Sequence, residues 1–152
     1  MILRKDMQNI NYIGMGPYES YIDKHHASWH GAFSASIDKM HEDYIMPQEN
    51  GSHHDCSYVR VSAPGANDGA DRTSHSIAVT SAVPFSMNAS PYTAEELTNA
   101  AHNYELPESN KSVLCIDYRQ NGIGSNSCGP ELDEKYRFDE DEWEFGFTMH
   151  VK

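Results

Sequence analysis

The sequence predicts an all-β fold, an antiparallel β-sandwich with one short helix near residues 93–101. Short apolar stretches of strand-forming residues recur along the chain, separated by turn-forming pairs. At the C-terminus, hydrophobic and polar side chains alternate with a period of two, whereas a helical signal interrupts the strands at one place. The 152 residues suffice for about one domain, so we expect residues 1–152 to share one core.

The strand patterns before the helix are short. They cover residues 9–15, 32–37, 58–62, 75–80 and 85–89. Pairs such as Gly16-Pro17 and Asn50-Gly51 separate them as turns. The helix begins with Thr93-Ala-Glu-Glu96, a capping box in which the Thr hydroxyl and the Glu carboxylate each accept a hydrogen bond from a backbone N–H.

Three strands are predicted after the helix. Residues 112–118 form an apolar run with the length of a strand buried on both faces. Residues 135–138 give a weaker signal. From Trp143 to Lys152 every second residue is apolar, which predicts a half-buried strand.

The charge balance excludes some classes of partner. Against 23 acidic residues stand 11 Lys and Arg, a formal net charge of −12. Such a chain repels phosphate backbones and anionic lipid surfaces, so we expect no nucleic-acid binding and no membrane association. The uncharged run 76–94 contains Pro84 and Pro91 and is too polar to span a bilayer.

Cysteine usage suggests a compartment. The three cysteines, Cys56, Cys115 and Cys128, are widely spaced and form no Cys-x-x-Cys pair. An odd number suits neither a disulfide scaffold nor a zinc knuckle. No apolar stretch follows the basic residues near Met1, so no secretory signal is recognised. We therefore expect a cytoplasmic protein.

Nine histidines raise the question of a metal. His26 and His30, or the run His53-His54-Asp55-Cys56, contain ligand atoms that zinc accepts. However, neighbouring histidines on a strand point to opposite faces, and the residues around Trp29 and Gly31 do not favour a helix. We expect polar loop histidines rather than a metal site.

The segment 121–130 reads Asn-Gly-Ile-Gly-Ser-Asn-Ser-Cys-Gly-Pro. It lacks the lysine of a phosphate-binding loop, and neither Ser125 nor Ser127 has glycines two residues away on both sides, as a nucleophile elbow requires. Its composition favours a tightly wound turn over a ligand site, although Ser and Asn side chains there could bind sugar hydroxyls.

Four stretches of the sequence, taken in order along the chain, carry a resemblance to a known family. They are Gly14–Lys24, Tyr44–Gly51, Phe85–Tyr92 and Gly122–Pro130. Together they resemble the C-terminal domain, or small chain, of glycoside hydrolase family 2 β-galactosidases. The resemblance implies a galactose-mutarotase-like β-supersandwich beside a separate TIM barrel that carries both catalytic glutamates and hydrolyses terminal β-galactosides. It therefore implies no catalytic residue and no cofactor in this chain; Mg²⁺ or Na⁺ ions that serve the parent enzyme are held elsewhere.

The resemblance also implies a site. In the family, a loop of this domain reaches the barrel mouth and lines the sugar pocket, and its matching residue here is Cys128, with Asn126 and Ser127 beside it. In the family this position holds an aromatic residue or a cysteine, and the Trp of some members gives a broader stacking surface. By the same resemblance, Glu49 and Asn50 hydrogen-bond a corner between strands, and Tyr18, Glu19, Tyr21 and Asp23 form a buried polar anchor.

The chain is shorter than the family's domain, and its first residues resemble that domain's interior. A sandwich cut in this way leaves strand edges and an apolar face uncovered, so we expect a homodimer in isolation. The alternative function is a stand-alone carbohydrate-binding module of mutarotase-like fold, using the 122–130 loop and exposed tyrosines to hold galactosides.

Overall fold

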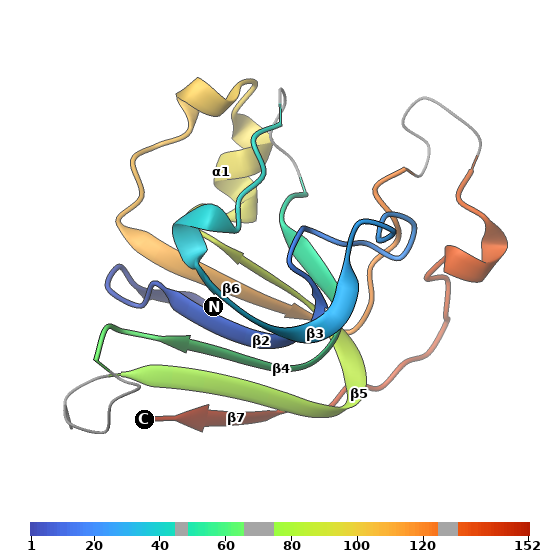
Figure 1. Cartoon of the computed structure of the whole chain (residues 1–152). Helices are drawn as coiled ribbons and strands as arrows, with labels where there is room; N and C mark the ends of the chain where they lie inside the picture. Colours follow the sequence, from blue (N-terminus) through green and yellow to red (C-terminus); the bar gives the residue numbers. More distant parts are fainter. Residues whose placement is uncertain (45–48, 66–74, 125–130) are drawn as a thin grey trace.

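The computed structural model describes residues 1–44, 49–65, 75–124 and 131–152. Its strands form one antiparallel sheet in the order β1-β6-β5-β4-β2-β3, with β7 paired to β5 (Figure 1). The strands are β1 (Ile2–Arg4), β2 (Asn9–Gly16), β3 (Trp29–Ser36), β4 (Ser52–Ser62), β5 (Ser76–Ser90), β6 (Lys111–Asp117) and β7 (Thr148–Val151). The helices are η1 (Ile37–Lys39), α1 (Ala94–Asn99), η2 (Asn103–Glu105) and η3 (Glu134–Tyr136). The predicted all-β antiparallel class is confirmed.

The long strand β5 joins the two parts of the sheet. Its first part pairs with β7 and its last part pairs with β6, while β4 lies along both. The prediction of two strands, 75–80 and 85–89, was wrong because β5 continues between them. Residues 81–84 of β5 lie opposite Ser57 alone, since Tyr58 pairs with Thr80 and Cys56 with Phe85. This irregularity bends β5 and breaks the pattern that a regular strand shows.

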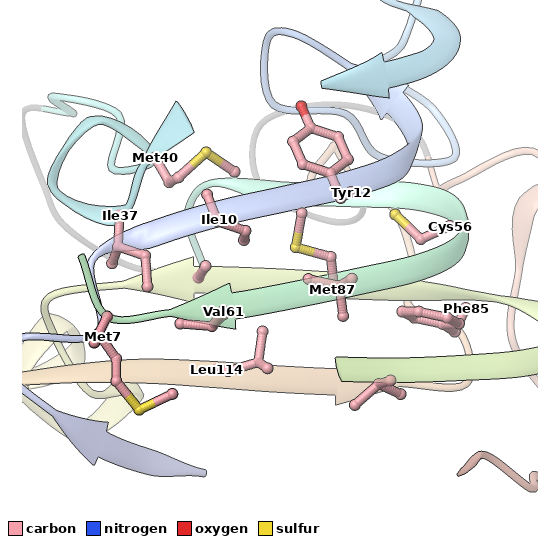
Figure 2. Close-up of a cluster of buried hydrophobic side chains, with 14 residues drawn as sticks. Met7, Ile10, Tyr12, Ile37, Met40, Cys56, Val61, Phe85, Met87 and Leu114 are labelled. Atoms are coloured by element: carbon pink, nitrogen blue, oxygen red, sulfur yellow. The ribbon is translucent and has the colours of Figure 1, made fainter. Parts of the chain in front are cut away.

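Two rows of apolar side chains cross one face of the sheet. One row joins Tyr12, Val59 and Val79 on paired strands, and the neighbouring row joins Ile10, Val61 and Ile77. Residues before and after the strands cover this face, and Figure 2 shows Ile37 and Met40 in the same cluster as Ile10 and Tyr12. The strand predicted over residues 9–15 is thus confirmed as β2, whose alternate residues Ile10 and Tyr12 pack in the core.

The same rows end at β7, where the core face is open to solvent. Val79 pairs with Met149 and Ile77 with Val151, yet Met149 is 39% exposed and Val151 is 73% exposed. The predicted strand over 143–152 is confirmed only for 148–151, and its predicted half-burial was wrong because no described element covers β7.

Two further predictions need correction. The expected strand at 135–138 is instead the 3-10 turn η3, whose segment pairs with no described strand. Strand β4 begins at Ser52 rather than near Tyr58, and its polar first half concealed the strand in the sequence. The strand predicted over 112–118 is β6, which is buried on both faces only at residues 112–114.

The capping box at α1 is confirmed. The Glu96 N–H donates to Thr93 Oγ1 at 3.2 Å, and the Thr93 N–H donates to Glu96 Oε2 at 2.8 Å. Lys111 Nζ also donates to Glu96 Oε1 at 2.5 Å, so this helix start is tied to β6. None of the helices in the described part of the chain has the length and apolar character that crossing a membrane requires.

The corner before β4 depends on Asn50 and Gly51. Asn50 is 2% exposed, and its amide accepts from the Glu42 N–H at 2.8 Å and donates to the Glu42 carbonyl at 2.7 Å. The predicted turn role of Asn50 is thus confirmed. Gly51 has a φ of 65°, and a Cβ there would lie 2.2 Å from the Met40 carbonyl oxygen.

We predict that Gly51→Ala lowers the free energy of unfolding by about 2 kcal/mol or more, because the side chain must enter a left-handed conformation and collide with backbone. Gly146→Ala is the matched control, since a Cβ there meets nothing within 4 Å. Chemical denaturation of both variants measures the difference. Equal losses in the two variants would contradict this role of Gly51.

Candidate functional site

A polar anchor precedes β3 and centres on Glu19. Glu19 is 7% exposed, and its carboxylate accepts hydrogen bonds from Lys24 Nζ, the Tyr44 hydroxyl and the Gly51 N–H, the last at 3.0 Å. Tyr21 is also buried, and burial raises the pKa of its hydroxyl. The predicted buried anchor is confirmed for Glu19 and Tyr21, whereas Tyr18 is 60% exposed, which corrects the prediction for that residue.

Asp23, four residues after Glu19, binds the start of the glycine-rich segment. Its Oδ1 accepts from the Ile123 N–H at 3.2 Å, and its Oδ2 accepts from the Gly124 N–H at 3.0 Å. Figure 1 shows the loop between β2 and β3 meeting the segment that follows β6. A Cβ on Gly122 would lie 2.0 Å from Asp23 Cγ, so only glycine admits this close approach.

The predicted site residues Asn126, Ser127 and Cys128 lie outside the described residues, which resume at Glu131. The structure therefore shows where the chain enters this segment, at Gly124, and that the Asp23 carboxylate binds the chain there. No sequence signal identified Asp23 in this role, because a residue about one hundred positions away cannot be paired with a turn by spacing.

A pocket of about 680 Å³ lies beside this anchored turn. Residues 83–86 of β5 line it, and β5 lies between the start of β4 and the end of β6 in the sheet. His54 and Asp55 line it from β4, and His25 lines it from the loop between β2 and β3. Residues after β6 line it as well, and they are Tyr118, Arg119, Gln120, Lys135, Tyr136, Arg137, Phe138 and Glu144.

An aromatic cluster supports the wall beyond β6. The Tyr118 ring stacks on Trp143 with centroids 5.5 Å apart and meets Phe138 edge-on at 5.7 Å. Phe145 adds a tilted contact to Tyr118 at 5.7 Å and packs against the core. The apolar residues that were predicted to continue the last strand therefore hold the pocket wall to the sheet.

The histidines do not assemble a metal centre in the described residues, where no group of three or more His, Cys, Asp and Glu side chains could hold an ion. His53 is buried, and its Nδ1 lies 2.9 Å from the Met15 carbonyl oxygen. Burial lowers the pKa of both His53 and His54, and the neighbouring His25 lowers that of His54 further. These two imidazoles are therefore neutral at pH 7.

Two cysteines fall within the described residues, and both are free thiols. Burial raises the pKa of Cys56 to about 12 and also raises that of the half-buried Cys115. A thiol with a raised pKa carries little thiolate at neutral pH, so neither is suited to act as a nucleophile.

Comparison with known proteins identifies relatives over nearly the whole chain. The family of β-galactosidase small chains matches residues 1–149. A β-galactosidase of Actinobacillus pleuropneumoniae is 46% identical over 147 residues, covering 97% of this chain and 13% of the relative. One of Staphylococcus xylosus is 38% identical over 149 residues, covering 98% and 14%. One of Kluyveromyces lactis is 29% identical over 144 residues, covering 93% and 13%. The chain thus spans about one seventh of the length of the curated relatives it matches.

We predict that Asp23→Ala speeds amide hydrogen exchange at Ile123 and Gly124 by about tenfold or more, because both N–H groups lose a charged acceptor. Hydrogen exchange followed by NMR measures this. Asp139→Ala removes a carboxylate from an exposed position and is the control. Unchanged exchange at both amides in Asp23→Ala would show that Asp23 does not hold the turn.

Proposed function

Since the chain belongs to the family of β-galactosidase small chains, we propose that it is the non-catalytic C-terminal part of a glycoside hydrolase family 2 β-galactosidase. In this proposal residues 1–152 form one domain that completes the sugar site of a separate TIM-barrel domain. The barrel carries the catalytic glutamates and hydrolyses terminal β-galactosides. The fraction of the relatives that the chain matches, 13% to 14%, supports a role as a part rather than a complete enzyme.

The observation that carries the proposal is the attachment of the glycine-rich segment to Asp23. A residue that lines a partner's pocket must be held at a fixed position, since errors of about 1 Å weaken catalysis severely. The hydrogen bonds of Asp23 to Ile123 and Gly124 fix the chain immediately before Asn126, Ser127 and Cys128. These three residues are therefore our candidates for contact with the galactoside.

We further propose a cytoplasmic location and no association with nucleic acid or membrane. The free thiols of Cys56 and Cys115 and the net charge of −12 support these parts of the proposal.

Complementation tests the function. The chain is mixed with the A. pleuropneumoniae β-galactosidase from which the matching region has been removed. We expect hydrolysis of an aryl β-galactoside only when both parts are present, because each part alone has an incomplete site. The Asp23→Ala chain should restore less activity than the Asp139→Ala control. Hydrolysis by the chain alone, or an inactive mixture of folded parts, would refute the proposal.

The same mixture tests Cys128. We expect Cys128→Trp to change the Michaelis constant for aryl galactosides, because a flat ring offers a larger stacking surface than a thiol. The reconstituted fold should be unchanged by circular dichroism. Identical kinetics for the two chains would remove Cys128 from the sugar site.

In isolation, we propose that the chain forms a homodimer. The exposed apolar side chains of Met149 and Val151 extend the core face beyond its cover, and a second copy can bury them. Light scattering at micromolar concentration measures the mass, and a monomeric mass would contradict the dimer.

A further inference from the structure

We propose that the chain by itself binds a neutral hexose in the pocket between the start of β4 and the segment after β6. The proposal concerns residues that are all described and that lie before and after the 125–130 segment. It does not require the catalytic partner. The volume of this pocket, about 680 Å³, falls within the usual range of small-molecule sites, about 300–1,000 Å³.

A bulge in β4 positions the polar side of the pocket. The pairing of β4 with β5 shifts between His53 and Cys56, and Asp55 within this shift has a φ of 55°. A left-handed residue in a bulge redirects its side chain out of the regular alternation of the strand. His54 and Asp55 consequently line the same pocket, although consecutive residues of a regular strand face opposite sides.

These two side chains have unused hydrogen-bonding capacity. Within the described residues the Asp55 carboxylate has no hydrogen bond or ion pair. The Nδ1 of His54 is enclosed without a partner, which leaves Nε2 as the ring nitrogen that a ligand could reach. An acceptor carboxylate next to a neutral imidazole suits adjacent sugar hydroxyls, which both donate and accept.

The charges in the pocket favour a neutral ligand over a phosphate. Each of its three long cationic side chains already has a carboxylate partner. Arg119 binds Glu140 at 2.6 Å, Arg137 binds Glu131 at 2.9 Å, and Lys135 lies 3.3 Å from Asp133. Among the lining residues that the structure describes, Asp55 is unpaired and each Lys or Arg is paired, so an anion entering the pocket meets a free carboxylate and no unpaired Lys or Arg.

Aromatic side chains supply the apolar side that a sugar ring requires. Tyr118, Tyr136 and Phe138 line the same pocket as the polar residues of β4. The C–H groups of a pyranose pack on such side chains while its hydroxyls face polar groups. A mixed wall of this kind fits a hexose better than a purely apolar ligand.

The test is an NMR titration of the purified chain with galactose, with glucose and with galactose 6-phosphate. We expect shifts at residues of the pocket with at least one neutral hexose, at a dissociation constant on the order of millimolar. The sugar phosphate should bind no more tightly than its parent. The absence of shifts at tens of millimolar, shifts confined to other surfaces, or tighter binding of the phosphate would overturn the proposal.

Substitutions of His54 and Asp55, each with a matched control, test whether these two side chains bind the sugar. His54→Phe keeps a ring but removes its nitrogens, and Asp55→Asn keeps a residue that tolerates positive φ but removes the charge. We expect each to weaken binding by at least about fivefold, reflecting the loss of a hydrogen bond. His150→Phe and Asp139→Asn, at exposed positions outside the pocket, should bind as the native chain does. Native affinity in both folded pocket variants would refute the assignment.

The titration and the complementation test can fail independently, so the two proposals are distinguished by experiment. Complementation with no hexose binding would refute this inference alone. Hexose binding with failed complementation would instead support a stand-alone carbohydrate-binding module.

Discussion

Two carboxylates, four residues apart in the loop between β2 and β3, hold together the segments that surround the candidate site. Glu19 receives the backbone of Gly51 and so fixes the corner from which β4 starts. Asp23 receives the backbone of Ile123 and Gly124 and so fixes the segment that follows β6. One short loop thereby links two parts of the chain that are far apart in sequence. Because Glu19 is almost fully buried, the loss of Lys24, its ion-pair partner, would leave a buried carboxylate without a compensating positive charge, which is costly.

The sequence was most informative where a local pattern determines the structure. The short strand signal at residues 9–15 predicted β2, and the Thr93 to Glu96 spacing predicted the start of α1, because both depend on neighbours in the chain. The last strand was overextended because the apolar residues Trp143 and Phe145 alternate as a strand would. In the structure they pack on Tyr118 instead, a tertiary contact that no local pattern reveals.

The pocket illustrates the limit of prediction more sharply. His54 and Asp55 are consecutive, and strand periodicity assigns them to opposite faces. They line one pocket because β4 is irregular at this point, opposite the bend of β5. Neither irregularity carries a glycine that would mark it in the sequence: the residue with positive φ is Asp55 itself. The sequence marks His54 and Asp55 as residues that could bind a metal, but their spacing alone does not reveal that both line one pocket.

The manner in which Asp23 holds its segment also explains how the segment can vary. Its carboxylate binds backbone N–H groups rather than side chains, so the attachment demands a glycine at residue 122 but places no chemical demand on residues 126–128. Because this support is a backbone attachment, it does not depend on the identity of the side chain at position 128, which is Cys in this chain. Under the proposed function, the sugar contact can thus be altered by substitution at position 128 without rebuilding the scaffold.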